Sequence, residues 1–151
     1  LVSTNVTSTR FTAPDAKILM VDDNAMNRKV FAQLLKRTKV KVTLCESGKE
    51  CLDLVKKEYF DMIFMDAAKG QYIHFMPEIM RLLKEGATLV SDNVLQDGDI
   101  IESHYAVTRR NRTIYKRMRE YLYELTHRED LVTAVLPIGD GITVSTKVKE
   151  K

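Results

Sequence analysis

Tryptophan is absent from this 151-residue chain, and cysteine, proline and glycine are all scarce. The two cysteines, Cys45 and Cys51, are too few for a disulfide framework, so we expect two reduced, at least half-buried thiols. The longest apolar runs, Ile18–Val21 and Met62–Met65, fall far short of the roughly 20 residues that span a bilayer. No basic-then-apolar leader opens the sequence. These absences exclude a disulfide-rich scaffold, argue against membrane association, and favour a cytoplasmic protein.

The chain also lacks a strong excess of either charge. Its formal net charge is +3, with 44% hydrophobic and 30% charged residues, which is typical of an ordinary globular domain. Basic residues gather from Arg109 to Arg119, but Glu120 and Glu124 follow closely and no aromatic platform accompanies them. Such a pattern is typical of a solvated helix face, so we expect no nucleic-acid partner.

The hydrophobic pattern predicts one α/β domain over residues 17–147, with flexible tails at 1–16 and 148–151. Short apolar runs indicate buried strands, and apolar residues at intervals of three and four indicate helices. Gly86 is expected to end the third helix. The predicted strands are 17–21, 40–44, 61–66, 87–91, 131–137 and 141–147, and the predicted helices are 26–37, 49–58, 73–84 and 109–127.

Strand and helix alternate four times before the turn Gly139-Asp140-Gly141, and aspartate followed by glycine between β-rich runs predicts a hairpin. Alternation of this kind predicts a doubly wound, three-layer α/β sandwich of the Rossmann-like or flavodoxin-like type. We expect a mostly parallel sheet that closes with a C-terminal antiparallel hairpin.

Three predicted strands end in acidic residues: Asp22-Asp23, Asp66 and Asp92. In doubly wound sheets, ligands bind beyond the carboxyl ends of the strands. Clustered carboxylates favour a hard divalent cation, so the sequence predicts a site for Mg²⁺, or Ca²⁺, drawn from these residues. The alternative is that Asp22 or Asp23 merely caps the following helix.

The first half of the chain resembles the receiver domain of response regulators, especially those of hybrid histidine kinases. The resemblance rests on Val21–Arg28, Glu46–Glu50 and Phe60–Asp66. It implies that Asp22 and Asp23 help to hold Mg²⁺, that Asp66 accepts a phosphoryl group, and that Ser91 supplies the switch hydroxyl. The lysine that receivers carry on their last parallel strand has no counterpart here.

The second half resembles the bacterial metal-dependent, catechol-type O-methyltransferases. Here the resemblance rests on Asp66–Tyr72 and Leu89–Leu95. It implies a divalent metal held by Asp66, Asp92 and Asn93, with Lys69 as the base. Lys69 as a solvated loop lysine stays open as an alternative.

The S-adenosylmethionine enzymes of this fold use a glycine-rich turn after their first strand, whereas no glycine precedes Gly48 here. We therefore expect no S-adenosylmethionine binding and interpret the chain as an engineered chimera joined near Asp66. Its predicted function is a scaffold without catalytic activity, with a possible homodimer formed through exposed apolar surface. The alternatives are residual Mg²⁺-dependent phosphoryl acceptance at Asp66 and, less favoured, S-adenosylmethionine-dependent O-methyl transfer.

Overall fold

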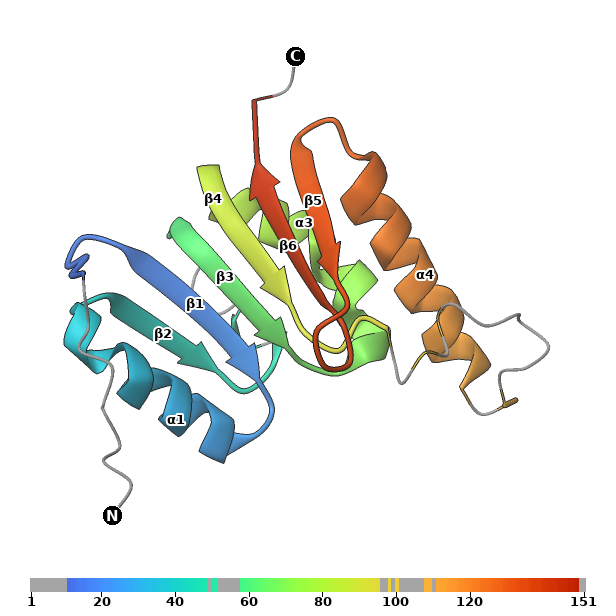
Figure 1. Cartoon of the computed structure of the whole chain (residues 1–151), viewed down its shortest axis with the longest axis horizontal. Helices are drawn as coiled ribbons and strands as arrows, with labels where there is room; N and C mark the ends of the chain where they lie inside the picture. Colours follow the sequence, from blue (N-terminus) through green and yellow to red (C-terminus); the bar gives the residue numbers. More distant parts are fainter. Residues whose placement is uncertain are drawn as a thin grey trace.

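The computed structural model describes residues 11–48, 50–51, 58–95, 98, 100, 108–109 and 111–149. Its elements alternate along the chain much as the sequence predicts (Figure 1). They are β1 (Lys17–Asp22), α1 (Ala25–Leu35), η1 (Lys36–Thr38), β2 (Lys41–Cys45), β3 (Phe60–Asp66), η2 (Lys69–Gln71), α3 (Tyr72–Leu82), β4 (Leu83–Ser91), α4 (Arg112–His127), β5 (Leu131–Leu136) and β6 (Ile142–Lys147).

The six strands form one sheet in the order β2-β1-β3-β4-β6-β5. Strand β1 runs parallel to both β2 and β3, and β3 runs parallel to β4. Strand β6 is antiparallel to its two neighbours, so the hairpin places the only reversed strand of the described sheet between β4 and β5. The predicted fold class, a mostly parallel α/β sandwich with a C-terminal antiparallel hairpin, is confirmed.

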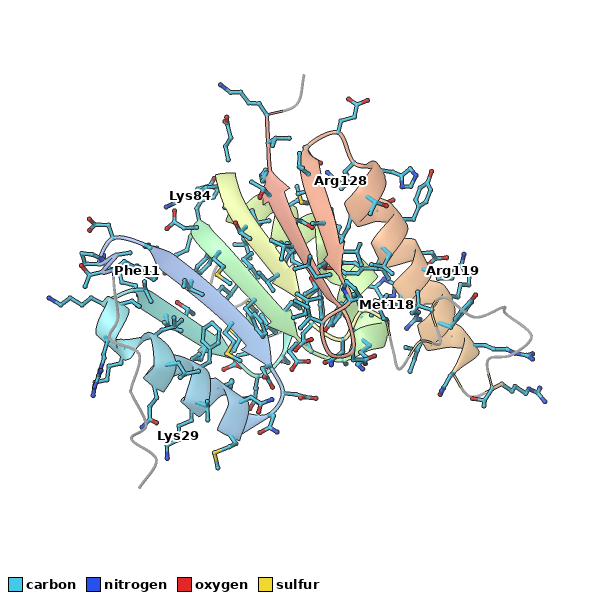
Figure 2. All side chains as sticks on the ribbon, viewed as in Figure 1. Phe11, Lys29, Lys84, Met118, Arg119 and Arg128 are labelled. Carbon is cyan, nitrogen blue, oxygen red and sulfur yellow. The ribbon has the colours of Figure 1, made fainter. Side chains whose placement is uncertain are left out.

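The main core lies between the sheet and the two helices α3 and α4, while α1 lies on the opposite face beside β1 and β2 (Figure 1). Leu19, Ile63 and Leu89 point from the central strands into this core and are at most 1% exposed. Met118 of α4 lies against the sheet, whereas the labelled Lys29 and Arg119 extend outward (Figure 2). Helix α1 contributes no fully buried residue, so the two faces of the sheet are covered unequally.

The α1 side of the sheet therefore presents a bare apolar surface among the described residues. Met26, Val30 and Leu34 recur at one helical interval along α1 and are 65%, 48% and 73% exposed. Val132, on the edge strand β5, is 63% exposed. Exposed apolar side chains favour association where they gather into a patch. The homodimer expected from the sequence stays a prediction.

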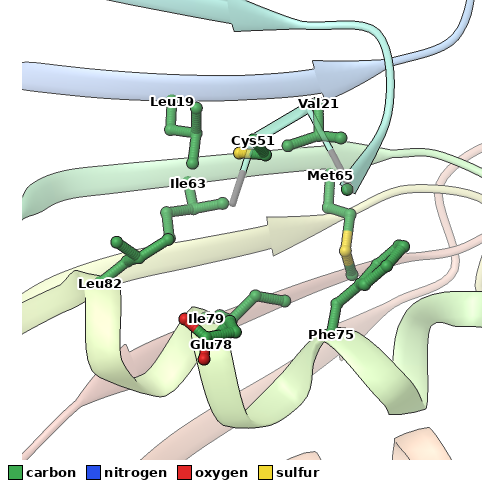
Figure 3. A pocket seen from close by; sticks show the side chains of 10 residues that line it. Leu19, Val21, Cys51, Ile63, Met65, Phe75, Glu78, Ile79 and Leu82 are labelled. Carbon is green, nitrogen blue, oxygen red and sulfur yellow. The ribbon is translucent and has the colours of Figure 1, made fainter. Parts of the chain in front are cut away.

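A small apolar cavity of about 30 Å³ lies between the sheet and α3 (Figure 3). Leu19, Ile63 and Leu82 are among the side chains around it. Its volume has room for no more than one or two water molecules, so it is a packing gap and not a cofactor site.

The start of β4 differs from the prediction. Helix α3 ends at Leu82, and the strand begins directly at Leu83, which is 1% exposed and pairs with Phe60. The register then shifts, because Lys84, Glu85 and Gly86 bulge out as exposed residues before Thr88 pairs with Met62. Gly86, with φ +78°, therefore shapes a bulge inside the strand and does not end the helix.

The predicted helix at 49–58 lies largely outside the described residues. Among the residues that the structure describes, no helix combines the length and the apolar character needed to cross a membrane.

Candidate functional site

The carboxyl ends of β1, β3 and β4 meet at a cleft of about 280 Å³ on the α1 side of the sheet. Asp22, Asp66 and Asp92 line it, one from each strand end. Apolar side chains complete the lining, including Phe31 and Phe64, whose ring centroids are 5.5 Å apart. The chain order reverses between β1 and β3, which is where doubly wound sheets bind ligands.

Asp22 ends β1 and is only 1% exposed. Its Oδ1 accepts the N–H of Asn24 at 2.7 Å, which closes the turn into α1. Asn24, and not either aspartate, caps α1: its side chain accepts the N–H groups of Met26 and Asn27. The alternative that Asp22 serves as the helix cap is therefore not what the structure shows.

Asp66 pairs with Asp22 across the adjacent strands β1 and β3. Burial raises the pKa of its carboxyl group, and the nearby charges of Asp22, Asp92 and Asp23 raise it further. Lys69 acts in the opposite direction but more weakly. Negative charges gathered around a carboxyl group whose pKa they raise mark a place where a bound cation would be favourable.

Asp92 follows β4 directly, and its N–H donates to the Met65 carbonyl at 3.1 Å, which holds it next to Asp66. The next residue, Asn93, has φ +55° and donates its N–H to Asp92 Oδ1 at 2.7 Å. Asparagine tolerates this left-handed conformation better than most residues do. The chain thus turns sharply at the strand end.

Tyr72 joins the ends of β3 and β4, although no pattern in the sequence predicts this role. Its hydroxyl group accepts the Ala67 N–H at 3.3 Å and lies 3.2 Å from the Asp92 carbonyl and 3.3 Å from that of Met65. Burial raises the pKa of Tyr72 above its ordinary value, and the charge of Asp66 adds to this effect. Its side chain is 0% exposed, so the hydroxyl group is a neutral clamp between the two loops that carry Asp66 and Asp92.

Replacing Tyr72 by phenylalanine should lower the free energy of unfolding by about 1–3 kcal/mol, because buried backbone groups lose their partner. Urea unfolding followed by circular dichroism measures this change. Tyr123→Phe is the matched control. Tyr123 is 61% exposed, so this substitution should change the free energy of unfolding by no more than about 0.5 kcal/mol. Equal effects of the two substitutions would contradict the clamp.

Lys69 lies at the start of η2, beside the β5–β6 turn. Its Nζ is 3.3 Å from Oδ2 of Asp140, and about a third of its side chain is exposed. The turn is also bonded to the loop after β4, because Val94 and Leu95 donate their N–H groups to the carbonyls of Gly141 and Asp140. The C-terminal hairpin therefore positions Lys69 next to the aspartate cleft, and Asp140 is a second residue whose role no sequence pattern predicts.

Two other residues selected from the sequence lie apart from this cleft. Asp23 is exposed and is not among the residues that line it. Ser91 points into the core on the α4 side, where its hydroxyl group is 2.6 Å from that of Tyr121. Over the described ranges, no group of three or more histidine, cysteine, aspartate or glutamate side chains is placed to hold a metal ion. A site built on Asp66 and Asp92 would therefore need the Asn93 amide or further non-protein ligands.

A family model of O-methyltransferases matches residues 4–148. Caffeoyl-CoA O-methyltransferase of Medicago sativa is 29% identical over 89% of this chain, and caffeoyl-CoA O-methyltransferase 5 of Nicotiana tabacum is 30% identical over the same share. The chain spans 58% and 60% of the lengths of these two relatives.

Solved structures agree on the fold. A structure of a caffeoyl-CoA O-methyltransferase homologue from Staphylococcus aureus has a TM-score of 0.67 at 24% identity, covering 87% of this chain and 76% of the other. The O-methyltransferase TomG of Streptomyces achromogenes, solved with S-adenosylmethionine, has a TM-score of 0.65 at 16% identity, covering 88% and 73%.

The family match runs through Asp66 without interruption, so the interpretation of the chain as a receiver joined to a methyltransferase is wrong. The receiver resemblance rests on short segments around strand ends, and parallel α/β folds of different families share such segments. The receiver-based alternative, phosphoryl acceptance at Asp66, is not supported. Ser91, its proposed switch hydroxyl, is bonded inside the core.

The prediction of an inert scaffold that does not bind S-adenosylmethionine is wrong as well. The matched family consists of methyltransferases, and structures of the same fold were solved with S-adenosylmethionine or its product. The turn after β1 has no glycine, so its backbone cannot approach a cofactor as closely as a glycine-rich turn can. The structure nevertheless has a cleft at the strand ends. Family match and fold lead to one conclusion: this chain belongs to the O-methyltransferase family.

Proposed function

We propose that the chain takes part in S-adenosylmethionine-dependent methylation of a hydroxyl group on a catechol-type substrate, assisted by a divalent metal ion. The observation that carries this proposal is the meeting of Asp66 and Asp92 at one cleft, with Lys69 held beside it by Asp140. The names of the plant relatives support an aromatic acceptor of the caffeoyl type.

The residues at the cleft fit a divalent cation by their chemistry. Asp66 and Asp92 offer carboxylate oxygens, and the following Asn93 offers an amide oxygen, which are ligands that Mg²⁺ prefers. The raised pKa of Asp66 has like charges among its causes, and a cation would relieve that repulsion. Asp66, Asp92 and Asn93 are therefore the proposed metal ligands.

The cleft also fits a cationic methyl donor. Oδ2 of Asp22 is a buried acceptor with no hydrogen-bond partner among the described residues, so it can accept from a positively charged group. The cleft reaches from the end of β1 to the end of β4, and this extent supports a donor site next to an acceptor site.

In the proposed reaction, S-adenosylmethionine supplies an electrophilic methyl group, and a metal ion lowers the pKa of the acceptor hydroxyl. The chain's own residues orient the acceptor hydroxyl group and remove its proton. Asp66 and Asp92 fix the position of the acceptor oxygen at the strand ends. Nζ of Lys69, as the neutral amine, takes the proton of the acceptor hydroxyl. Asp140 stabilises the ammonium group that results, and this ammonium group must pass its proton to water before the next turnover. Apolar side chains such as Phe31 and Phe64 keep water from part of the cleft.

Incubation of the protein with S-adenosylmethionine, Mg²⁺ and either catechol or caffeoyl-CoA, followed by mass spectrometry, tests this proposal. We expect a product that is heavier by one methylene group. Chelation of the metal should lower the rate about 100-fold or more, because metal assistance contributes several kcal/mol. Catechol and a monophenol are a matched pair, since only catechol offers two adjacent oxygens to a metal.

No methylated product from either acceptor, with S-adenosylmethionine shown to bind, would exclude this substrate class. A rate that chelation leaves unchanged would exclude the metal ligands proposed here while leaving methyl transfer standing.

A further inference from the structure

The two cysteines of the chain lie together in the core, next to β1. Cys45 ends β2 and is 0% exposed, while Cys51 is 5% exposed and belongs to the same core cluster. Cys45 pairs with Val21 of β1 in the register of the sheet, so both side chains point to the same face. Val21 and Cys51 line one cavity on that face (Figure 3). Because adjacent strands are about 5 Å apart, Cys51 also lies close to Cys45.

The two thiol groups interact through a hydrogen bond. It lowers the pKa of the Cys45 thiol, and together with burial it raises the pKa of the Cys51 thiol. These opposite directions mean that Cys51 donates its S–H and that Cys45 accepts it. The bond stabilises a thiolate on Cys45, and a thiolate is the reactive form of cysteine.

The turn between the two cysteines is held by reciprocal hydrogen bonds. The Ser47 hydroxyl group accepts the Glu50 N–H at 3.2 Å, and the Glu50 carboxylate accepts the Glu46 N–H at 2.7 Å. This arrangement is a capping box, which fixes the start of a helical turn. The Cys51 N–H donates to the Ser47 carbonyl at 3.1 Å and closes that turn. The fold therefore sets the position of Cys51 relative to Cys45.

The small cavity between the sheet and α3 gives access to this pair. Cys51 lines the cavity, and so does Glu78, whose side chain is 41% exposed (Figure 3). The cavity thus borders the surface at one end and the Cys51 side chain at another. Its volume of about 30 Å³ admits one or two water molecules, and hydrogen peroxide is of this size. Bulkier oxidants do not fit.

We propose that Cys45 and Cys51 form an oxidation site at which hydrogen peroxide converts the two thiols into a disulfide. The site lies on the opposite face of the sheet from the aspartate cleft and does not depend on the proposed function.

The chemistry takes two steps. Cys51 passes its proton to the Cys45 thiolate along their hydrogen bond and attacks one oxygen of the peroxide. The O–O bond breaks, and the hydroxide that leaves takes this proton from Cys45 and becomes water. The Cys45 thiolate then attacks the sulfenic acid on Cys51, so the S–S bond forms and the S–O bond breaks. The second hydroxide takes up the proton that Cys45 first released. Two thiols are oxidised, one peroxide is reduced, and two water molecules form.

The test is treatment of the folded protein with hydrogen peroxide, then denaturation, alkylation with iodoacetamide and intact-mass spectrometry. We expect a monomer that is lighter by two hydrogen atoms and takes up no alkyl group, and a reductant should restore both thiols. The chain has only two cysteines, so an intramolecular disulfide identifies this pair. Cumene hydroperoxide is the matched bulky oxidant. It should oxidise the pair at least about 10-fold more slowly, because access limits attack on a buried thiol.

Two variants test the order of the steps. Cys45→Ser should stop at a sulfenic acid on Cys51, which dimedone traps. Cys51→Ser should leave Cys45 reduced under the same treatment, since Cys45 is not among the residues that line the cavity. A dimedone adduct on Cys45 in Cys51→Ser would overturn the proposed route, and so would equal rates with the two oxidants.

The unaltered protein alone decides whether the site exists. Methionine oxidation with both thiols still open to alkylation would overturn the proposal, and so would a disulfide that joins two chains. The oxidised protein should melt no lower than the reduced one, because the new bond joins groups that the native fold already holds together. A lower melting temperature would show that the disulfide strains the fold and would also overturn it.

Discussion

Asp66→Asn should abolish most methyl transfer while leaving the fold intact. The substitution removes one of two proposed carboxylate ligands at the cleft, and we expect kcat/KM to fall about 10²- to 10³-fold. The unliganded protein should melt at the same or a higher temperature. Because the pKa of Asp66 is raised in the folded state, its ionised form costs stability above that pKa, and neutral asparagine avoids the cost. Initial rates and circular dichroism melting curves measure the two effects.

Asp61→Asn is the matched control, because Asp61 lies at the opposite end of the same strand. The Lys84 ammonium group and the Lys17 N–H hold the pKa of Asp61 below its usual range. A lowered pKa contributes stability above the unfolded-state value, which is lost as the pH falls through the folded-state value. Asp61→Asn should thus lower the melting temperature near neutral pH and leave kcat/KM nearly unchanged. Activity that survives Asp66→Asn would rule out Asp66 as a metal ligand.

Gly141→Ala should destabilise the protein by about 2–4 kcal/mol. Gly141 has φ +83°, and an added Cβ would lie 2.3 Å from Leu95 Cγ and 2.9 Å from Leu95 Cβ. The left-handed backbone and the clash act together, and the clash involves atoms near the Leu95 backbone, which cannot simply rotate away. The loop after β4 must therefore move away from the β5–β6 turn. Urea unfolding curves measure the resulting decrease in the free energy of unfolding.

Gly139→Ala separates the two causes. Gly139 also has a positive φ, +57°, but nothing lies within 4 Å of the added Cβ. This control should lose only about 1 kcal/mol, the cost of a left-handed alanine. Similar losses of stability in Gly141→Ala and Gly139→Ala would mean that the clash with Leu95 does not contribute to the destabilisation. Gly141→Ala should also slow methyl transfer, since Asp140 in the same turn positions Lys69.

Much of the fold could be predicted because its strands are short apolar runs that end in charged residues. Residues 17–22 and 60–66 are both of this kind, and their predicted ends lie within one residue of the observed ones. The bulge at Gly86 could not be predicted, since a glycine after a helical pattern usually marks the end of the helix. Only the pairing of Leu83 with Phe60 shows that the strand has already begun.

The family was misjudged for a related reason. The segment from Asp61 to Asp66 suits a receiver as well as a methyltransferase, and each half of the chain was interpreted by its own local motifs. The match over residues 4–148 depends on spacing along the entire chain, which no single motif carries. In the structure, the carboxyl ends of the predicted strands bring Asp22, Asp66 and Asp92 to one cleft. Tyr72 and Asp140 could not be found in this way, because their roles depend on contacts made only after folding.

The unequal covering of the sheet has a practical consequence for the measurements described above. Dyes that fluoresce in apolar surroundings should bind the native protein along α1 and β5, where Leu34 and Val132 are 73% and 63% exposed. Dye-based melting assays would then start from a high signal and report a small or inverted transition. Retention on a hydrophobic column should likewise exceed that expected from a mean hydropathy of −0.23. Far-ultraviolet dichroism avoids this background, since it follows the backbone and not the surface.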